Sequence, residues 1–237
     1  MRNYLIVAMF AASLADAAIG SYEEHRSLDL DATGIDALQV EAGAGSLEIS
    51  GVAGLDEIVV KATIRVPTSD VDKARERIKL GLTLNLEEQG EVAALVALFD
   101  DSGWGRGTAP TVNLQVQVPA RLNLEIRDGS GAVVVRNIDG DIEIEDGSGA
   151  IDVSAVGGDV SIEDNSGSIL VLDAASDVEI RDGSGSITVR GVGGSVIVDD
   201  GSGSIDVSEV AEDLIIEGDG SGSLDYSGIA GQVDTGS

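Results

Sequence analysis

The chain has 237 residues, of which 43 are acidic and 14 basic, and its formal net charge is −29. Such a field repels nucleic acid and anionic membrane surfaces, so we expect neither as a partner. Because the chain has no cysteine, disulfides are excluded and the fold must be stabilised by packing alone.

Residues 1–17 have the pattern of a secretory signal peptide. Arg2 supplies a positive start, Tyr4–Leu14 form an apolar run too short to span a bilayer, and Ala15-Asp16-Ala17 resemble a cleavage site. No later segment is long and apolar enough to cross a membrane. We therefore expect an exported protein in the periplasm, at the cell surface or outside the cell, with no transmembrane segment after cleavage.

Residues 18–66 predict N-terminal strands and a first, irregular coil. Gly45 has the place of a corner glycine, and alternating aliphatic residues follow it. The inward positions of this coil would be Leu47, Ile49, Ile58 and Val60. His25, the one histidine of the sequence, falls in a segment that we expect to be frayed, at the surface.

Residues 67–110 predict an insertion made of one helix and one hairpin. Ser69 is the expected N-cap of the helix. The hairpin strands are expected at about Leu80–Leu86 and Val92–Phe99. Trp104 follows in a glycine-rich loop, either as an exposed partner contact or folded back onto apolar surface. The insertion would cover one end of the remaining fold.

Residues 111–237 contain a repeat of 18 residues with the consensus D-G-S-G-[AS]-h-x-V-x-x-h-x-G-x-h-x-h-x, where h is aliphatic. Each unit alternates apolar and polar residues over two short strands and leaves no room for a helix. The constant length favours stacked coils over a meander of antiparallel hairpins. We therefore predict an all-β chain: a parallel β-solenoid, like a single-stranded β-helix or β-roll, with 18-residue two-strand coils.

Glycine at the second unit position predicts a positive φ there, and glycine at the fourth predicts a tight corner. Some residues between the inward positions are apolar, which makes them candidate points of partner contact or self-association. These residues are Val134, Leu170, Leu172, Ile197 and Ile215.

The first residue of each unit is an aspartate, and stacking would place these carboxylates in a column. Such a column raises the pKa values of its members or recruits divalent cations loosely. The alternative, which we favour, is a solvated corner whose carboxylates cap backbone N–H groups. The weak metal candidates are Asp128, Asp146, Asp164, Asp182, Asp200 and Asp219. In calcium-binding rolls the metal-ligating aspartate falls where this repeat has aliphatic residues, so that mode of binding is disfavoured.

Neither a catalytic residue nor a cofactor is predicted. With one histidine, no cysteine and three lysines outside the repeats, acid–base chemistry would have to depend on carboxylates, as in glycoside hydrolysis. Only 3% of the residues are aromatic, which argues against stacking on sugars. We therefore expect a protein that is not an enzyme and rank a carbohydrate-active enzyme as the least favoured alternative.

The segment "TVNLQVQVPARLNLEIRDGSG" carries an alternating strand ending in Val118-Pro119, a second strand over residues 122–126 and then a glycine corner. Together with the recurrent "GSGxIxV" coils, it resembles the bacterial putative-adhesin β-strand-repeat family of unknown function, which includes heads described as toast-rack or auto-transporter-adhesin-like. The resemblance extends from about Ala37 onward and implies an exported, envelope-associated parallel β-helix.

On this basis we expect a non-enzymatic, adhesin-like or scaffold interaction module of the cell envelope. Its partner would be an unknown protein or a surface glycan, and the chain could also form a homo-oligomer. The alternative is a low-affinity calcium-binding envelope protein that uses the aspartate column.

Overall fold

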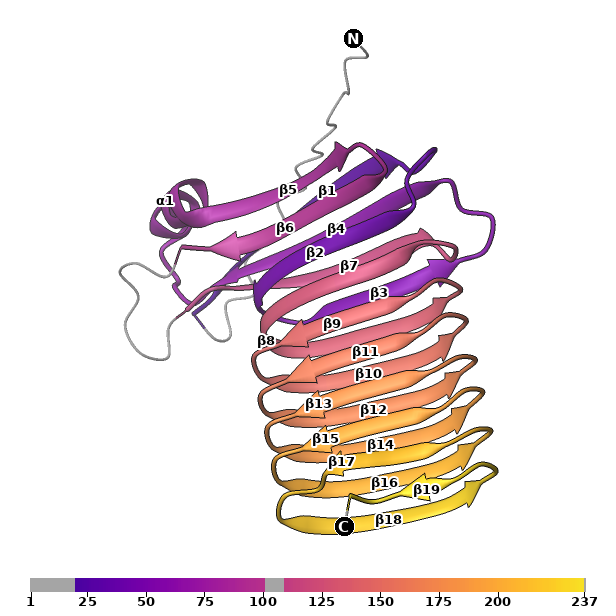
Figure 1. The fold of residues 1–237 in the computed structure, drawn as a ribbon. Helices are drawn as coiled ribbons and strands as arrows, with labels where there is room; N and C mark the ends of the chain where they lie inside the picture. Colours follow the sequence, from indigo (N-terminus) through magenta and orange to yellow (C-terminus); the bar gives the residue numbers. More distant parts are fainter. Residues whose placement is uncertain (1–19, 101–108, 237) are drawn as a thin grey trace.

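The computed structural model describes residues 20–100 and 109–236. The predicted signal peptide and Trp104 lie outside these residues. Within them, a stack of flat coils forms the longer part of the molecule, and the N-terminal strands with one helix form a broader part at one end of the stack (Figure 1). The all-β, parallel solenoid predicted from the repeat is confirmed.

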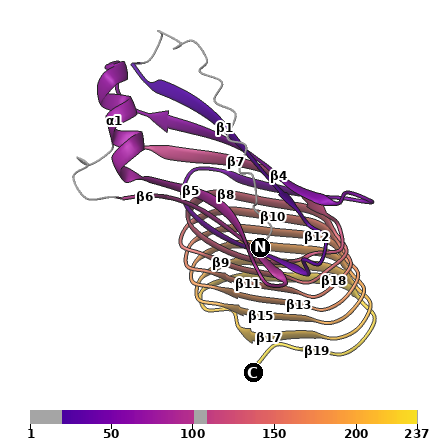
Figure 2. The same ribbon diagram turned by 90° about the horizontal axis from the view of Figure 1, so that it is seen from above.

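Each coil contributes one strand to each of two sheets, which we call sheet A and sheet B; both sheets are parallel throughout the solenoid (Figures 1 and 2). In sheet A the strands are the second half of β8 (Asn123–Ile138), β10 (Gly149–Val156), β12 (Gly167–Ala174), β14 (Gly185–Val192), β16 (Gly203–Val210) and β18 (Gly222–Ile229). In sheet B they are the first half of β8, β9 (Ile142–Asp146), β11 (Val160–Asp164), β13 (Val178–Asp182), β15 (Val196–Asp200), β17 (Leu214–Gly218) and β19 (Val233–Asp234).

Equivalent residues stack directly on one another. Ile151, for example, pairs with Val133 in one neighbouring coil and with Ile169 in the other. These side chains are almost completely buried and fill the space between the sheets with aliphatic carbon. Because every inward position meets its own equivalent, one residue type at each position is enough to build a continuous core.

The solenoid begins with the irregular coil formed by β2 (Ala37–Ala44) and β3 (Leu47–Val52), which lie beside β8. Here Leu47 and Ile49 are buried, as predicted. Ile58 and Val60 belong instead to β4 (Glu57–Val66), which runs antiparallel to β1 (Tyr22–Asp31) and β7 (Thr111–Pro119). Their expected place in a parallel coil is therefore wrong, although both are buried.

The insertion consists of α1 (Val71–Gly81), β5 (Leu82–Gln89) and β6 (Val92–Phe99). The N-cap of α1 is Asp70 and not Ser69, because the Asp70 carboxylate accepts the Lys73 N–H at 3.1 Å. The strand β6 extends sheet B by pairing with β2, and β5 pairs antiparallel with β6. The apolar end of the first coil is thereby covered.

The tight corner predicted at the fourth unit position is confirmed, because a Cβ there would overlap the backbone of the adjacent coil, but the positive φ predicted at the second position is wrong. The fourth position has the positive φ, between +136° and +155° in five coils, whereas the second position has one only at Gly220. A Cβ at Gly147, a second-position residue, would lie 2.5 Å from the Gly129 carbonyl oxygen. Close approach of the next coil therefore favours glycine at the second position, although the third unit accommodates Asn165 there.

Candidate functional site

The aspartate column, Asp128, Asp146, Asp164, Asp182 and Asp200, lies inside the solenoid. Exposed fractions of these residues are 8%, 4%, 6%, 5% and 2%, so the expected solvated corner is wrong. Each aspartate continues the inward alternation of its sheet B strand, as Asp146 does after Ile142 and Ile144 in β9. That alternation was visible in the sequence. Asp219, in the last coil, is exposed and does not join the column.

The two oxygens of these carboxyl groups have different surroundings. In four coils Oδ1 accepts the N–H of the serine two residues later, at 3.0–3.2 Å, so the expected capping is present. In all five coils Oδ2 is sealed from solvent and has no hydrogen-bond partner. Buried polar atoms are normally paired, so five orphaned oxygens in a line are exceptional.

Burial raises the pKa values of all five carboxyl groups, because it disfavours the charged form. For Asp128, burial and then the charge of Asp146 raise the pKa to about 7. For Asp182, burial raises the pKa to about 6, and Asp164 and Asp200 add to the shift. The expected mutual repulsion is thus present in the column, but burial is the larger cause.

Besides the aspartate column, a ladder of side-chain oxygens runs along the solvent side of sheet B at unit position 14. The sequence did not reveal this ladder. Each side-chain oxygen accepts the backbone N–H of the equivalent residue in the next coil: Asn123 from Asp141 at 2.9 Å, Asp141 from Asp159 at 2.9 Å, and Asp159 from Asp177 at 3.2 Å. Asp177 continues the ladder by accepting from Ser195 at 2.7 Å. The only sequence signal was an acidic residue at a fixed position in the repeat.

The ladder lines a groove of about 530 Å³ that crosses the strands from β8 to β15. We call it the sheet B groove. Beside the ladder it contains outward residues of unit position 16: Glu125, Glu143, Ser161, Glu179 and Ile197. Glu125 and Glu179 are ion-paired with Arg127 and Arg181 respectively. Among the residues that the structure describes, none that lines the groove is basic.

The five apolar contact candidates do not form one patch. Val134, Leu170 and Leu172 lie on sheet A, and Ile197 and Ile215 lie on sheet B. All five are half-buried. Ile197 and Ile215 are register partners in neighbouring coils, and Ile197 lines the sheet B groove.

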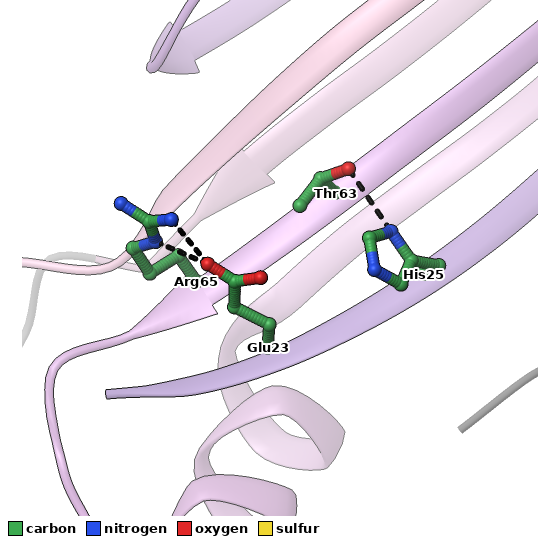
Figure 3. A network of polar contacts seen from close by, with 4 residues as sticks. All are labelled: Glu23, His25, Thr63 and Arg65. Atoms are coloured by element: carbon green, nitrogen blue, oxygen red, sulfur yellow. Dashed lines mark hydrogen bonds and ion pairs between the residues drawn. The ribbon is translucent and has the colours of Figure 1, made fainter. Parts of the chain in front are cut away.

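His25 belongs to β1, so the expectation of a frayed segment is wrong. It is the register partner of Thr63 in β4, and its Nδ1 lies 3.1 Å from the Thr63 hydroxyl oxygen (Figure 3). Close by, the Arg65 guanidinium donates to the Glu23 carboxylate (Figure 3). These contacts join β1 to β4 across one side of the N-terminal part, away from the sheet B groove.

Among residues 20–100 and 109–236, no group of three or more His, Cys, Asp or Glu side chains is arranged to hold a metal ion. In the same residues, no helix has the length and apolar character needed to span a membrane.

Comparison with known proteins gives likeness at the level of solved structures only. No protein-family model and no curated protein matches the sequence. A putative cell adhesion protein from Clostridium sporogenes is 12% identical, with a TM-score of 0.40 over 90% of this chain and 98% of that chain. A putative adhesin from Bacteroides fragilis is 15% identical, with a TM-score of 0.37 over 89% and 96%. At these values, the likeness transfers no function to this chain.

Proposed function

We propose that the chain is an exported, non-enzymatic, adhesin-like interaction module whose sheet B groove binds a cationic segment of a partner protein. The observation that carries this proposal is the groove itself, in which carboxylates recur from coil to coil beside a hydrophobic pair. The regular stack holds these groups at a spacing of about 4.8 Å. An extended basic segment lying along the groove would meet at least one carboxylate in each coil from β8 to β13.

The ladder does not need its negative charge for folding. Asn123 accepts the next coil's N–H at the same distance as Asp141 does, 2.9 Å. An amide oxygen is thus sufficient for the hydrogen bond, whereas stacked like charges oppose one another. The charges of Asp141, Asp159 and Asp177 are a structural cost, and attraction of a cationic partner accounts for it.

Ile197 gives the groove an apolar end, and its register partner Ile215 lies in the next coil. Complementary charge raises the rate and specificity of association, while buried apolar contact supplies affinity. The partner would therefore carry Lys or Arg residues followed by an apolar group. A surface glycan fits less well, because among the described residues the groove lining has no aromatic side chain on which a sugar could stack.

We propose that the chain is not an enzyme, because its carboxyl groups with strongly raised pKa values are inaccessible to a substrate. A general acid or base must reach its substrate, but the orphaned oxygens of the carboxyl groups with strongly raised pKa values are sealed inside the solenoid. His25 interacts with Thr63 on the N-terminal sheet. Export remains proposed from the signal-peptide pattern of residues 1–17.

The test is capture from an envelope extract with residues 18–237 as bait. The groove variant Asp159→Asn/Asp177→Asn keeps the ladder's acceptors and removes two charges. The control variant Asp206→Asn/Asp225→Asn removes two exposed charges from sheet A. We expect the partner to be retained by the wild type and the control, to be released by salt, and to be lost from the groove variant.

Loss of binding from the control variant to the same extent would show that net charge alone attracts the partner, and would refute the groove as the binding site. A partner retained by the groove variant but lost from Leu170→Asp/Leu172→Asp would place the binding face on sheet A.

A further inference from the structure

We propose that the aspartate column is a proton-binding site: its stacked carboxyl groups carry protons in the folded protein, and the solenoid is destabilised when those protons are lost. This inference is independent of the proposed function. It assigns a role to the five buried oxygens that have no hydrogen-bond partner.

Geometry supports a proton over a free carboxylate. Oδ2 packs against the glycine corner of its own coil; a Cβ built at Gly167 would lie 3.1 Å from Asp164 Oδ2. An ionised oxygen there is sealed from solvent and has no donor to stabilise its charge. A proton on Oδ2 removes this charge, and the neutral group no longer repels the carboxyl groups of the adjacent coils, about 4.8 Å away along the stack.

The charged groups around the column cannot replace the protons. The residue before each aspartate points to solvent beside the column; these residues are Arg127, Glu145, Glu163, Arg181 and Asp199. Three are acidic, and the two arginines are ion-paired with glutamates. Above the column, Asp128 pairs with Ala42, and Ala42 pairs with Ala97, so the register partners at that end are not ionisable. Below it, Asp219 is acidic and exposed.

The direction of the pH effect follows from the raised pKa values of the folded state. Unfolded aspartates ionise near pH 3.9. In the folded protein Asp128 retains its proton up to about pH 7 and Asp182 up to about pH 6. The column's contribution to stability is thus complete below the unfolded pKa and is lost as the pH rises through the folded values.

Proton uptake on refolding tests this directly. Urea-unfolded wild-type protein is diluted into unbuffered solution in a pH-stat at about pH 5, where unfolded aspartates are mostly ionised. The raised pKa values of Asp128 and Asp182, about 7 and about 6, predict that the wild type takes up about two protons more than Asp128→Asn/Asp182→Asn. The control Asp206→Asn/Asp225→Asn should take up as many protons as the wild type.

Carbon-13 NMR of the aspartate carboxyl groups in the wild-type protein keeps the proposal testable if the column variant does not fold. We expect a carboxyl signal with a midpoint near 7. Midpoints of all the column carboxyls near 4, or equal uptake by the wild type and a folded column variant, would overturn the proposal. A melting temperature that rises on addition of calcium, together with carboxyl groups ionised at about pH 5, would show that the column binds a cation instead of protons.

Discussion

The corner glycines at the fourth unit position should be the least replaceable residues of the solenoid, and Gly167→Ala tests this. Gly167 has a φ of +155°, and a Cβ added there would lie 1.6 Å from the Gly149 carbonyl oxygen. Because that oxygen belongs to the backbone of the adjacent coil, no side-chain rotation relieves the overlap. The two coils must separate at the corner.

The expected loss has two parts. Alanine in this region of φ costs about 1–3 kcal/mol. Separation of these two corners breaks the hydrogen bond of 3.0 Å from Gly149 N–H to the Ser166 oxygen. At about 1 kcal/mol, it brings the total to about 2–4 kcal/mol, a large part of the stability of an ordinary domain.

Urea unfolding, followed by circular dichroism, measures this loss. Two glycines of the same chain separate the contributions. Gly90 has a φ of +75° and open space around it, so Gly90→Ala should cost only the backbone strain, about 1–2 kcal/mol. At Gly43 the φ is not in the positive region, and a Cβ would make ordinary contact with the Leu98 side chain at 3.5 Å, so Gly43→Ala should change stability by less than about 0.5 kcal/mol.

The comparison of Gly167→Ala with Gly90→Ala shows whether close approach between the coils adds to the cost of backbone strain. If both variants lose the same stability, close approach between the coils contributes nothing, and the fourth glycine serves only its φ. If Gly167→Ala unfolds in a separate, earlier transition, the corner strain is confined to neighbouring coils, as nearest-neighbour coupling in a repeat protein allows.

Three further predictions concern the repeat. Ala155 has a left-handed φ of +56°, a strained conformation that glycine adopts freely. Ala155→Gly should therefore raise the unfolding free energy by about 0.5–1 kcal/mol, which is the strain energy relieved minus the larger entropy cost of ordering glycine. A lower urea midpoint for this variant would contradict the prediction. Asp159→Asn should leave the unfolding free energy unchanged or slightly raised. Asp159→Ala should lower it by about 1 kcal/mol, because the Asp177 N–H loses its acceptor. Equal urea midpoints for the two variants would show that this hydrogen bond does not contribute to stability. Because the pKa values of Asp128 and Asp182 are raised to about 7 and about 6, the urea midpoint of the wild type should fall as the pH rises from about 5 to about 8. A urea midpoint that does not change over this pH range would contradict the prediction.

The solenoid was predictable because its period is exact: each inward position meets its own equivalent, so the sequence repeat and the spatial repeat coincide. The N-terminal part has no such repeat. There the alternation of β4 predicts a strand with buried Ile58 and Val60 but does not say whether that strand pairs in parallel or antiparallel. Pairing direction depends on long-range contacts that a single strand pattern does not encode.

The candidate sites were harder to predict, because residue type was a poor guide to environment. Asp146 was expected in solvent since aspartate is rarely buried, yet its strand alternation places it inside. The left-handed backbone at unit position 10 was missed because Asn137, Ala155 and Glu209 share no residue type there. The ladder of Asp141 and Asp159 was missed because its bonds join coils, and they become visible only when the stack is built.

The aspartate column and the ladder differ in whether folding favours the charged or the neutral side chain. Inside, at Asp146 and its equivalents, burial without a donor on Oδ2 makes the ionised form a cost that the fold avoids by keeping the group neutral. Outside, at Asp159 and its equivalents, water stabilises the charge, and Asn123 shows that an uncharged side chain makes the same bond. Only the outer ladder therefore carries negative charge that packing does not explain, and the sheet B groove is where a binding partner should be sought first.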